Sequence, residues 1–198
     1  MTHPNKNSIP LNRYLVFLAI AGSGFGVDIW SKSAVFSKLG FPGGFTEPFI
    51  EGWLEFRFYT SFNHGALWGM GQGYSLFFAA LSFIAIFGIS FWLFVKRAAI
   101  FWWINIALAF IMAGILGNLY DRMGLHGYIN PKTDAPIQAV RDFFYFKFGT
   151  YNWPIFNVAD ICLVSGACML ILHSFLFDQN ESSTDQPQED INKSLKEA

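Results

Sequence analysis

Two aspartates, Asp142 and Asp160, are the residues of this sequence whose type and position best suit catalysis. Asp160 ends the sequence FNVAD at residues 156–160, where a long apolar run begins, and Asp142 lies in VRDFF at residues 140–144. An ionisable group at the edge of hydrocarbon is costly, which makes it a candidate for a functional site. Two carboxylates brought together near a membrane could form an aspartate dyad, which can activate water for peptide hydrolysis.

The composition indicates the environment in which these aspartates act. The chain has 198 residues, of which 53% are hydrophobic, 19% aromatic and only 14% charged. A soluble domain is usually about 25% charged, so this chain has too few charges to cover its apolar residues with a polar surface. We therefore expect an integral membrane protein surrounded by membrane lipid. The net charge of -1 gives no basic field that would attract nucleic acid, so no nucleic-acid partner is expected.

Four apolar segments approach the roughly 20 residues that span a bilayer. They cover residues 14–30, 73–95, 98–120 and 154–177. The sequence therefore predicts a mainly α-helical fold, a four-transmembrane-helix bundle that forms a single domain over residues 1–177. The remaining tail, residues 178–198, is rich in polar and acidic residues, and we expect it to be disordered and cytoplasmic.

Basic residues predict how the bundle is oriented. The connection between the second and third segments is the basic pair Lys96-Arg97, and the N-terminal tail carries Lys6 and Arg13 without an acid. Because basic residues in short loops favour the cytoplasm, four spans place both termini inside and both long loops outside. A cleaved signal peptide is an alternative for the first segment. It is disfavoured because the apolar character continues past Gly26.

The first outer loop has the pattern of a β-strand. Residues 53–59, WLEFRFY, alternate apolar and charged side chains and are rich in aromatics, and FPGG at residues 41–44 indicates a turn. We expect a small extracytoplasmic β-rich region in this loop, lying on the membrane surface.

In the first span, Gly22 and Gly26 are spaced to let another helix approach closely.

Further polar residues follow helical spacing. Asp28 and Lys32 lie i, i+4 on one face, which predicts a salt bridge and is compatible with positioning an active site. Asn157 and Asp160 lie i, i+3 and also share a face, and a helix-opening polar cluster is the plain alternative to catalysis there. At the end of the third span, one face holds Asn118, Asp121 and Arg122. A polar residue within an apolar helix needs a partner, so this cluster predicts a polar network inside the bundle.

Metal and serine chemistry receive little support. The four histidines show no HExxH or other ligand spacing, and Cys162 and Cys168 lie within one apolar segment, too close on one helix to form a bridge. No GxSxG motif occurs either. We expect no metal and no organic cofactor.

Five short motifs follow one another along this four-span plan. They are Asp28 with Lys32, Asn63-x-Gly-Ala, Gly117-Asn118-x-x-Asp121-Arg122, Val140-x-Asp142-Phe, and Phe156-Asn157-x-Ala159-Asp160. In this order they resemble lipoprotein signal peptidase, the type II signal peptidase of bacteria. The resemblance covers residues 14–175.

The resemblance implies an aspartic peptidase, a hydrolase of the bacterial cytoplasmic (inner) membrane with its active site toward the outer face. Such an enzyme removes the signal peptide from diacylglyceryl-modified prolipoproteins and cuts before the lipidated cysteine. The catalytic pair would be Asp142 and Asp160, and we expect a monomer. The residues implied to bind substrate or support the site are Asp28, Lys32, Asn63, Asn118, Asp121, Arg122 and Asn157.

The chain departs from the family pattern at residues 129–138, which are inserted before Val-x-Asp. The insertion contains Asp134, a second candidate for the first catalytic aspartate. Asp142 is preferred because Val140 precedes it and two phenylalanines follow. His64 and Trp68 also differ from the residues expected of the family, and we expect them to narrow the cleft.

Two other classes of function remain as alternatives. A small proton-coupled transporter or lipid-handling protein would use Asp28, Lys32 and Asp160 as a relay. Such proteins commonly have paired halves and broken midplane helices, which this sequence lacks. A non-enzymatic assembly subunit would keep its function without either aspartate.

Overall fold

The computed structural model describes residues 8–65, 71 and 73–177, and long helices dominate this part of the chain. The helices are α1 (Leu11–Leu39), α2 (Ser75–Ser90), α3 (Trp102–Arg122) and α4 (Val158–Phe177). A π-helical turn, Phe91–Val95, extends α2. Four helices are thus long and apolar enough to cross a membrane, and the predicted helical membrane fold is confirmed. The tail at 178–198 and Trp68 lie outside the described residues.

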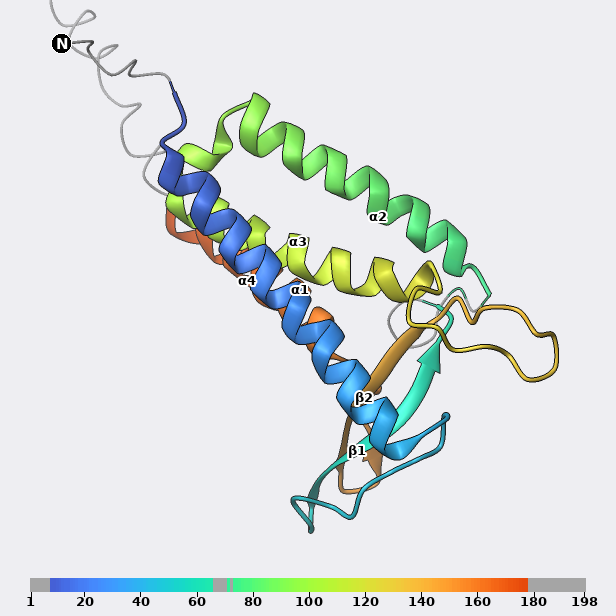
Figure 1. Ribbon diagram of the computed structural model, residues 1–198. Helices are drawn as coiled ribbons and strands as arrows, with labels where there is room; N and C mark the ends of the chain where they lie inside the picture. The colour runs from blue at the N-terminus through green and yellow to red at the C-terminus, as the bar shows by residue number, and fades with distance from the viewer. Residues whose placement is uncertain (1–7, 66–70, 72, 178–198) are drawn as a thin grey trace, which may run out of the picture.

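Helix α3 is the inner helix of the bundle. It packs against α1 and α4 on one side and α2 on the other (Figure 1). Its Leu108, Ala109 and Met112 are buried in one apolar cluster with Phe17 of α1 and Leu93 beyond α2. The outer helices instead expose large apolar side chains. In a bilayer such side chains meet lipid, so their exposure fits the membrane environment.

Close packing of the helices depends on small residues, although not on the pair predicted in α1. Both Gly22 and Gly26 face open space, so that prediction is wrong. The close approach is made by Gly24 instead, where an added Cβ would lie 2.7 Å from the Cβ of Ala113 in α3. Between α3 and α4, a Cβ at Gly114 would collide with the backbone carbonyl of Ala159. The helix that carries Asp160 is thereby held tightly against α3.

Helix α1 is longer than the apolar run that predicted it. It continues beyond residue 30 to Leu39, because its last turns find an apolar partner in the sheet: Val35 and Phe36 are buried against Phe143. The helix ends at Gly40, whose φ of 80° suits a residue without a Cβ and whose N–H donates to the Phe36 carbonyl. Asp28 and Lys32 therefore lie well inside α1.

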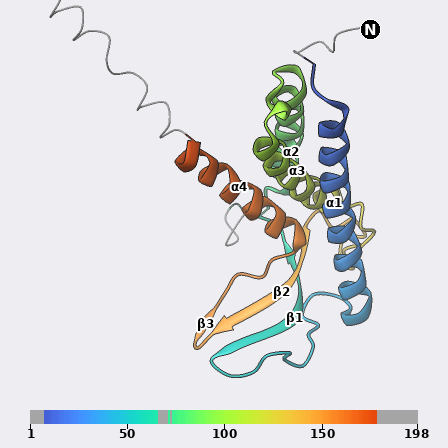
Figure 2. The ribbon, with the colours of Figure 1, turned by 90° about the vertical axis from the view of Figure 1, so that its left-hand side faces the viewer.

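The sheet joins the long loop after α1 and the long loop after α3, at the end of the bundle away from the α2–α3 connection (Figure 2). Its antiparallel strands are β1 (Leu54–Asn63), β2 (Val140–Phe148) and β3 (Tyr151–Asn152), in that order. The strand predicted in the first loop is confirmed. The expectation that the first loop alone forms the β-rich region is too narrow, because β2 and β3 come from the second loop.

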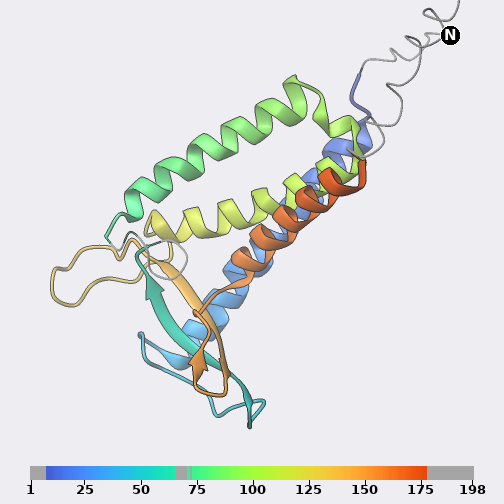
Figure 3. The same cartoon turned by 180° about the vertical axis from the view of Figure 1, so that it is seen from behind.

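The pairing of β1 with β2 is irregular beside Asp142. Phe58 pairs with Phe144 but Ser61 pairs with Asp142, so β1 carries an extra residue between these positions. A bulge of this kind bends a strand and re-aims its side chains, and such bulges are common beside active sites. Seen from behind, the sheet lies beside the end of α3 and the start of α4 (Figure 3).

Candidate active site

Asp142 lies on β2 and Asp160 lies in the first turn of α4, and the chain between them returns to meet β2. The backbone N–H groups of Phe143 and Phe144 both donate to the Phe156 carbonyl, at 3.0 and 2.8 Å. This pairing lays the segment before α4 alongside β2. The start of α4 is thereby placed beside Asp142.

Asn157 contacts both aspartates. Its side-chain amide donates to Asp142 Oδ1 at 2.6 Å, and its backbone N–H donates to Asp160 Oδ2 at 3.1 Å. Asn157 itself is fully buried. The two carboxyl groups are thus held by one buried residue that contacts both of them.

Asn118 of α3 supports the same pair from the other side. Its Nδ2 donates to Asp160 Oδ1 at 2.9 Å. Its Oδ1 accepts from Lys32 Nζ and from Asn157 Nδ2, each at 3.2 Å. All of the polar atoms of this buried amide therefore serve to fix the groups around Asp160.

The predicted salt bridge in α1 is present, and it also reaches the site. Lys32 Nζ lies 2.7 Å from Asp28 Oδ2 and 3.3 Å from Asp121 Oδ2, all three side chains being fully buried. Asp28 Oδ1 accepts the backbone N–H of Ala159 at 2.8 Å. A Cβ at Gly117 would collide with the Asp28 carboxylate, so the glycine before Asn118 makes room for this contact.

Asp121 and Arg122 do not act together, contrary to the shared face predicted for them. Asp121 faces Lys32 and Arg141, whereas Arg122 donates from Nη2 to the Gly65 carbonyl at 3.2 Å. Adjacent residues on a helix point in different directions. The two side chains therefore face different parts of the protein and bind different partners. Arg141 was not predicted; an arginine inside the aromatic strand sequence VRDFFYF was the signal that could have indicated it.

A cavity of about 890 Å³ contains both aspartates. Its polar side also holds Asn63, Asn118 and Arg122. Its other walls are largely apolar and include Trp153, Pro154, Ile155, Ile161, Leu163 and Val164. Such a cavity suits an extended peptide segment with apolar side chains, whose backbone would face the carboxyl groups.

The environment raises the pKa of Asp142 well above that of an ordinary aspartate. Burial is the main cause, because the side chain is only 2% exposed, and the charge of Asp160 is the second. Hydrogen bonds from Asn157 and Asn63 and the charge of Lys32 act in the opposite direction and have less effect on this pKa. The surroundings of Asp142 therefore favour its protonated form. Asp160 is only half-buried.

The alternative aspartate, Asp134, lies elsewhere. It is exposed on the inserted loop with a φ of 53°, and it does not line the cavity among the residues described. Among the histidines, cysteines and acids that the structure describes, no group of three lies close enough to hold a metal ion. Metal independence itself stays a prediction.

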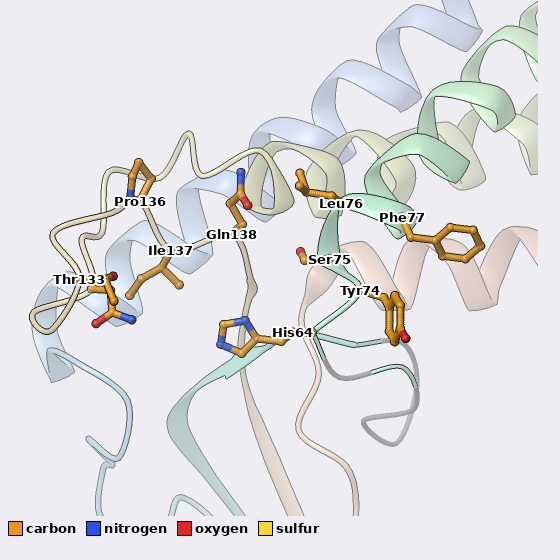
Figure 4. A pocket seen from close by; sticks show the side chains of 11 residues that line it. His64, Tyr74, Ser75, Leu76, Phe77, Thr133, Pro136, Ile137 and Gln138 are labelled. Atoms are coloured by element: carbon orange, nitrogen blue, oxygen red, sulfur yellow. The ribbon is translucent and has the colours of Figure 1, made fainter.

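The inserted residues 129–138 form one wall of a second, smaller cavity of about 350 Å³ (Figure 4). The loop folds back on itself through a bridge between Ile129 and Pro136. Ser75 at the start of α2 and His64 lie across from it (Figure 4). His64, expected to narrow the cleft, lines this second cavity and not the described walls of the one that contains the aspartates.

Comparison with known proteins identifies the family. A family model described as signal peptidase (SPase) II matches residues 20–176. The lipoprotein signal peptidase of Rhodopirellula baltica is 42% identical over 175 residues, covering 85% of this chain and 75% of that protein. The lipoprotein signal peptidase of Xanthomonas oryzae is 31% identical over 169 residues, covering 83% and 91%.

Solved structures agree at the level of the fold. A structure described as a bacterial membrane enzyme at 2.3 Å resolution superposes with a TM-score of 0.66 and 22% identity, covering 94% of this chain and 99% of that one. A second such enzyme, at 1.9 Å resolution, has a TM-score of 0.62 and 24% identity. Together with four apolar helices and the match over residues 20–176, these similarities mean that this multi-pass bacterial membrane protein is a peptidase and belongs to the signal peptidase II family.

Proposed function

We propose that this enzyme removes the signal peptide from diacylglyceryl-modified prolipoproteins, cutting before the lipidated cysteine, with Asp142 and Asp160 as its catalytic dyad. The observation that carries the proposal is the position of Asn157, which donates to both carboxyl groups at 2.6 and 3.1 Å beside a largely apolar cavity. The names of the relatives support the class of substrate.

In the proposed reaction, Asp160 begins ionised and Asp142 begins protonated. Asp160 takes a proton from a water molecule, whose oxygen attacks the scissile carbonyl carbon. Asp142 donates its proton toward the carbonyl oxygen and stabilises the negative charge that develops there. When the tetrahedral intermediate collapses, the C–N bond breaks and the leaving amine takes up a proton from Asp160. The former carbonyl oxygen returns its proton to Asp142 as the C=O bond re-forms, so both carboxyl groups regain their starting states. The raised pKa of Asp142, caused by burial and by the charge of Asp160, supports this division of roles.

The remaining polar residues have supporting roles in this proposal. Asn118 and Asn157 hold the carboxyl groups at a fixed orientation, and Asn63 and Arg122 face the cavity where the substrate backbone would lie. Asp28, Lys32 and Asp121 form the buried charge network behind them.

We also propose that the dyad faces the outer side of the membrane and that both termini are cytoplasmic. The sheet and the dyad lie at the end of the bundle opposite the Lys96-Arg97 connection between α2 and α3 (Figure 1). If that basic connection is cytoplasmic, water reaches the dyad from outside while signal helix and lipid chains stay in the bilayer. We propose a monomer, with lipid covering the exposed apolar faces.

The alternatives are less well supported. A proton-coupled transporter or lipid-handling protein is not favoured, because the chain belongs to a peptidase family. An assembly subunit would need no enclosed pair of carboxyl groups.

One experiment tests the proposal directly. The purified enzyme is incubated with a diacylglyceryl-modified prolipoprotein, and the products are separated and their N-termini identified. We expect cleavage immediately before the modified cysteine and no cleavage of the unmodified precursor. Equal cleavage of both precursors, or of neither, would contradict the proposed substrate.

A further inference from the structure

Arg141, the residue immediately before Asp142, is almost completely buried, with 2% of its surface exposed. Its Nε and Nη2 donate to Asp121 Oδ1 at 3.1 and 2.9 Å, and its backbone N–H donates to Asp121 Oδ2 at 2.9 Å. The remaining nitrogen, Nη1, donates to Ser33 Oγ at 3.2 Å. Every side-chain nitrogen of Arg141 therefore has a partner on α1 or α3.

This geometry is specific to arginine. The guanidinium group is planar and holds its donors in a fixed fork, so the contacts define an orientation as well as a distance. A lysine could place a charge near Asp121, but it could not contact Asp121 and Ser33 with the same rigidity. The first residues of β2 are thus fastened to two helices.

The same contacts connect Arg141 with both aspartates of the proposed dyad. On one side, a single peptide bond joins Arg141 to Asp142. On the other, Asp121 Oδ2 lies 3.3 Å from Lys32 Nζ, which donates to Asn118 Oδ1 at 3.2 Å. Asn118 in turn donates to Asp160 at 2.9 Å.

We propose that Arg141 is a positioning residue that sets the distance and orientation of Asp142 relative to Asp160, an inference that rests on the proposed function of these two aspartates. It acts through Asp121 and does not touch the substrate, because it is not among the described residues that line the cavity. A misplacement of about 1 Å in a catalytic group can lower a rate on the order of 100-fold. The turnover number is therefore the quantity on which this residue acts.

Arg141 also balances charge in the buried network. The charged and titratable groups that face it or lie in that network are Asp28, Lys32, Asp121, Arg122, His126, Asp142 and Asp160. Without Arg141, Lys32 would be the cation that pairs with both Asp28 and Asp121. With less positive charge nearby, the ionised forms of the neighbouring carboxyl groups would be less stable. The acidic limb of the activity profile should then move to higher pH.

The test compares Arg141→Met and Arg141→Lys with Lys147→Met, a control that removes a cation from the same strand but outside the buried network. The kcat, the KM, the pH profile and the thermal unfolding temperature are measured in detergent on a lipidated prolipoprotein. We expect Arg141→Met to lower kcat on the order of 100-fold with KM little changed, and its acidic limb to move to higher pH. Arg141→Lys should recover part of kcat, and the control should behave like the wild type.

A double variant, Arg141→Met with Asp121→Asn, tests whether the two residues act as one unit. Effects of residues in one network are not additive, so kcat of the double variant should be no lower than that of the worse single variant. Additive losses, a wild-type kcat in folded Arg141→Met, or a change in KM alone would overturn the inference. If Arg141→Met does not fold, the test rests on Arg141→Lys. If the kcat of Arg141→Lys falls only in proportion to its folded fraction, Arg141 stabilises the fold without positioning Asp142, and the inference is overturned. Turnover by Asp142→Asn in the same assay would instead overturn the dyad.

Discussion

Asn157 and Asp160 hydrogen-bond each other twice across the first turn of α4. The Asp160 N–H donates to Asn157 Oδ1, and the Asn157 N–H donates to Asp160 Oδ2, each at 3.1 Å. This reciprocal pattern is a capping box, in which two side chains satisfy the N–H groups at the start of a helix. The position of the Asp160 carboxylate is thus fixed by the same contacts that begin the helix.

The two interpretations of FNVAD are therefore compatible. From the sequence, Asn157 and Asp160 could either open a helix or form part of a catalytic cluster. In the structure they do the first, and Asn157 also contacts Asp142 at 2.6 Å. Since capping orients Asp160 before any substrate arrives, little reorganisation would be needed during the reaction.

The first prediction concerns the dyad. Asp142→Asn and Asp160→Asn should each abolish cleavage of a lipidated prolipoprotein while leaving the enzyme folded in the membrane, because an amide can neither take nor share the proton. Asp134→Asn is the matched control on the exposed insertion and should remain fully active. Near-normal turnover by either dyad variant would rule out the assignment.

The helices and the motif residues could be predicted from sequence because each depends on local pattern. Apolar length predicts the four spans, and helical spacing predicts the contact of Asp28 with Lys32. The ends of the elements depend on distant partners: α1 runs to Leu39 because Phe36 finds Phe143. No local pattern contains that information.

Which side chains pair with each other in the polar network could not be predicted from the sequence either. Helical spacing grouped Asp121 with Arg122, but Asp121 pairs with Lys32 and with Arg141, which lies twenty residues further along the chain. The pairing requires β2 to lie against α3, and β2 in turn requires the strand from the first loop. Long-range pairing of this kind appears only when the fold is assembled.

The second prediction follows from the raised pKa of Asp142. Between the ordinary aspartate pKa and this raised pKa, the folded state holds a proton that the unfolded state has lost, so the free energy of unfolding falls as pH rises. Asn at position 142 cannot ionise and avoids this loss. Asp142→Asn should therefore unfold at a higher temperature than the wild type at neutral and alkaline pH.

The difference should shrink as pH is lowered toward the ordinary pKa of aspartate, where both states of the wild type are protonated. Thermal unfolding in detergent across a pH series measures it. A difference that is constant with pH would show that Asp142 is not the group responsible.

The third prediction concerns metals. No ligand spacing occurs among the histidines, cysteines and acids of the sequence, and the proposed reaction uses carboxyl groups alone. Incubation with EDTA followed by gel filtration should leave kcat unchanged. Loss of activity that zinc restores would contradict the aspartic mechanism.

The fourth prediction concerns topology. A reporter fused after Ala198 should indicate a cytoplasmic position, and a reporter inserted within residues 129–138 should indicate an external position. The reason is that the basic Lys96-Arg97 connection favours the inner side. Reporter activity is measured in intact cells. The reverse result would place the dyad on the cytoplasmic side. The proposed function requires it on the outer side, so that result would contradict the proposal.

The last prediction separates residues that the sequence had grouped. Asp121→Ala would leave Lys32 and Arg141 buried beside an empty site, and breaking a buried ion pair in this way costs about 3–5 kcal/mol. Asn118→Ala removes hydrogen bonds to Asp160 and Lys32, which should cost about 1–3 kcal/mol. Arg122 is only half-buried, and its partner is the carbonyl of Gly65, so Arg122→Ala should lower the free energy of unfolding least.

Activity should follow a different order. Arg122 lines the cavity beside Asp142 and Asp160, so Arg122→Ala should lose turnover while its unfolding temperature stays near that of the wild type. Asp121→Ala should lose both, since the network behind the dyad collapses with it. Thermal unfolding and turnover measured on the same detergent preparations distinguish the two patterns. If Arg122→Ala were as unstable as Asp121→Ala, the two side chains would share one buried network, and their separation on α3 would have no energetic meaning.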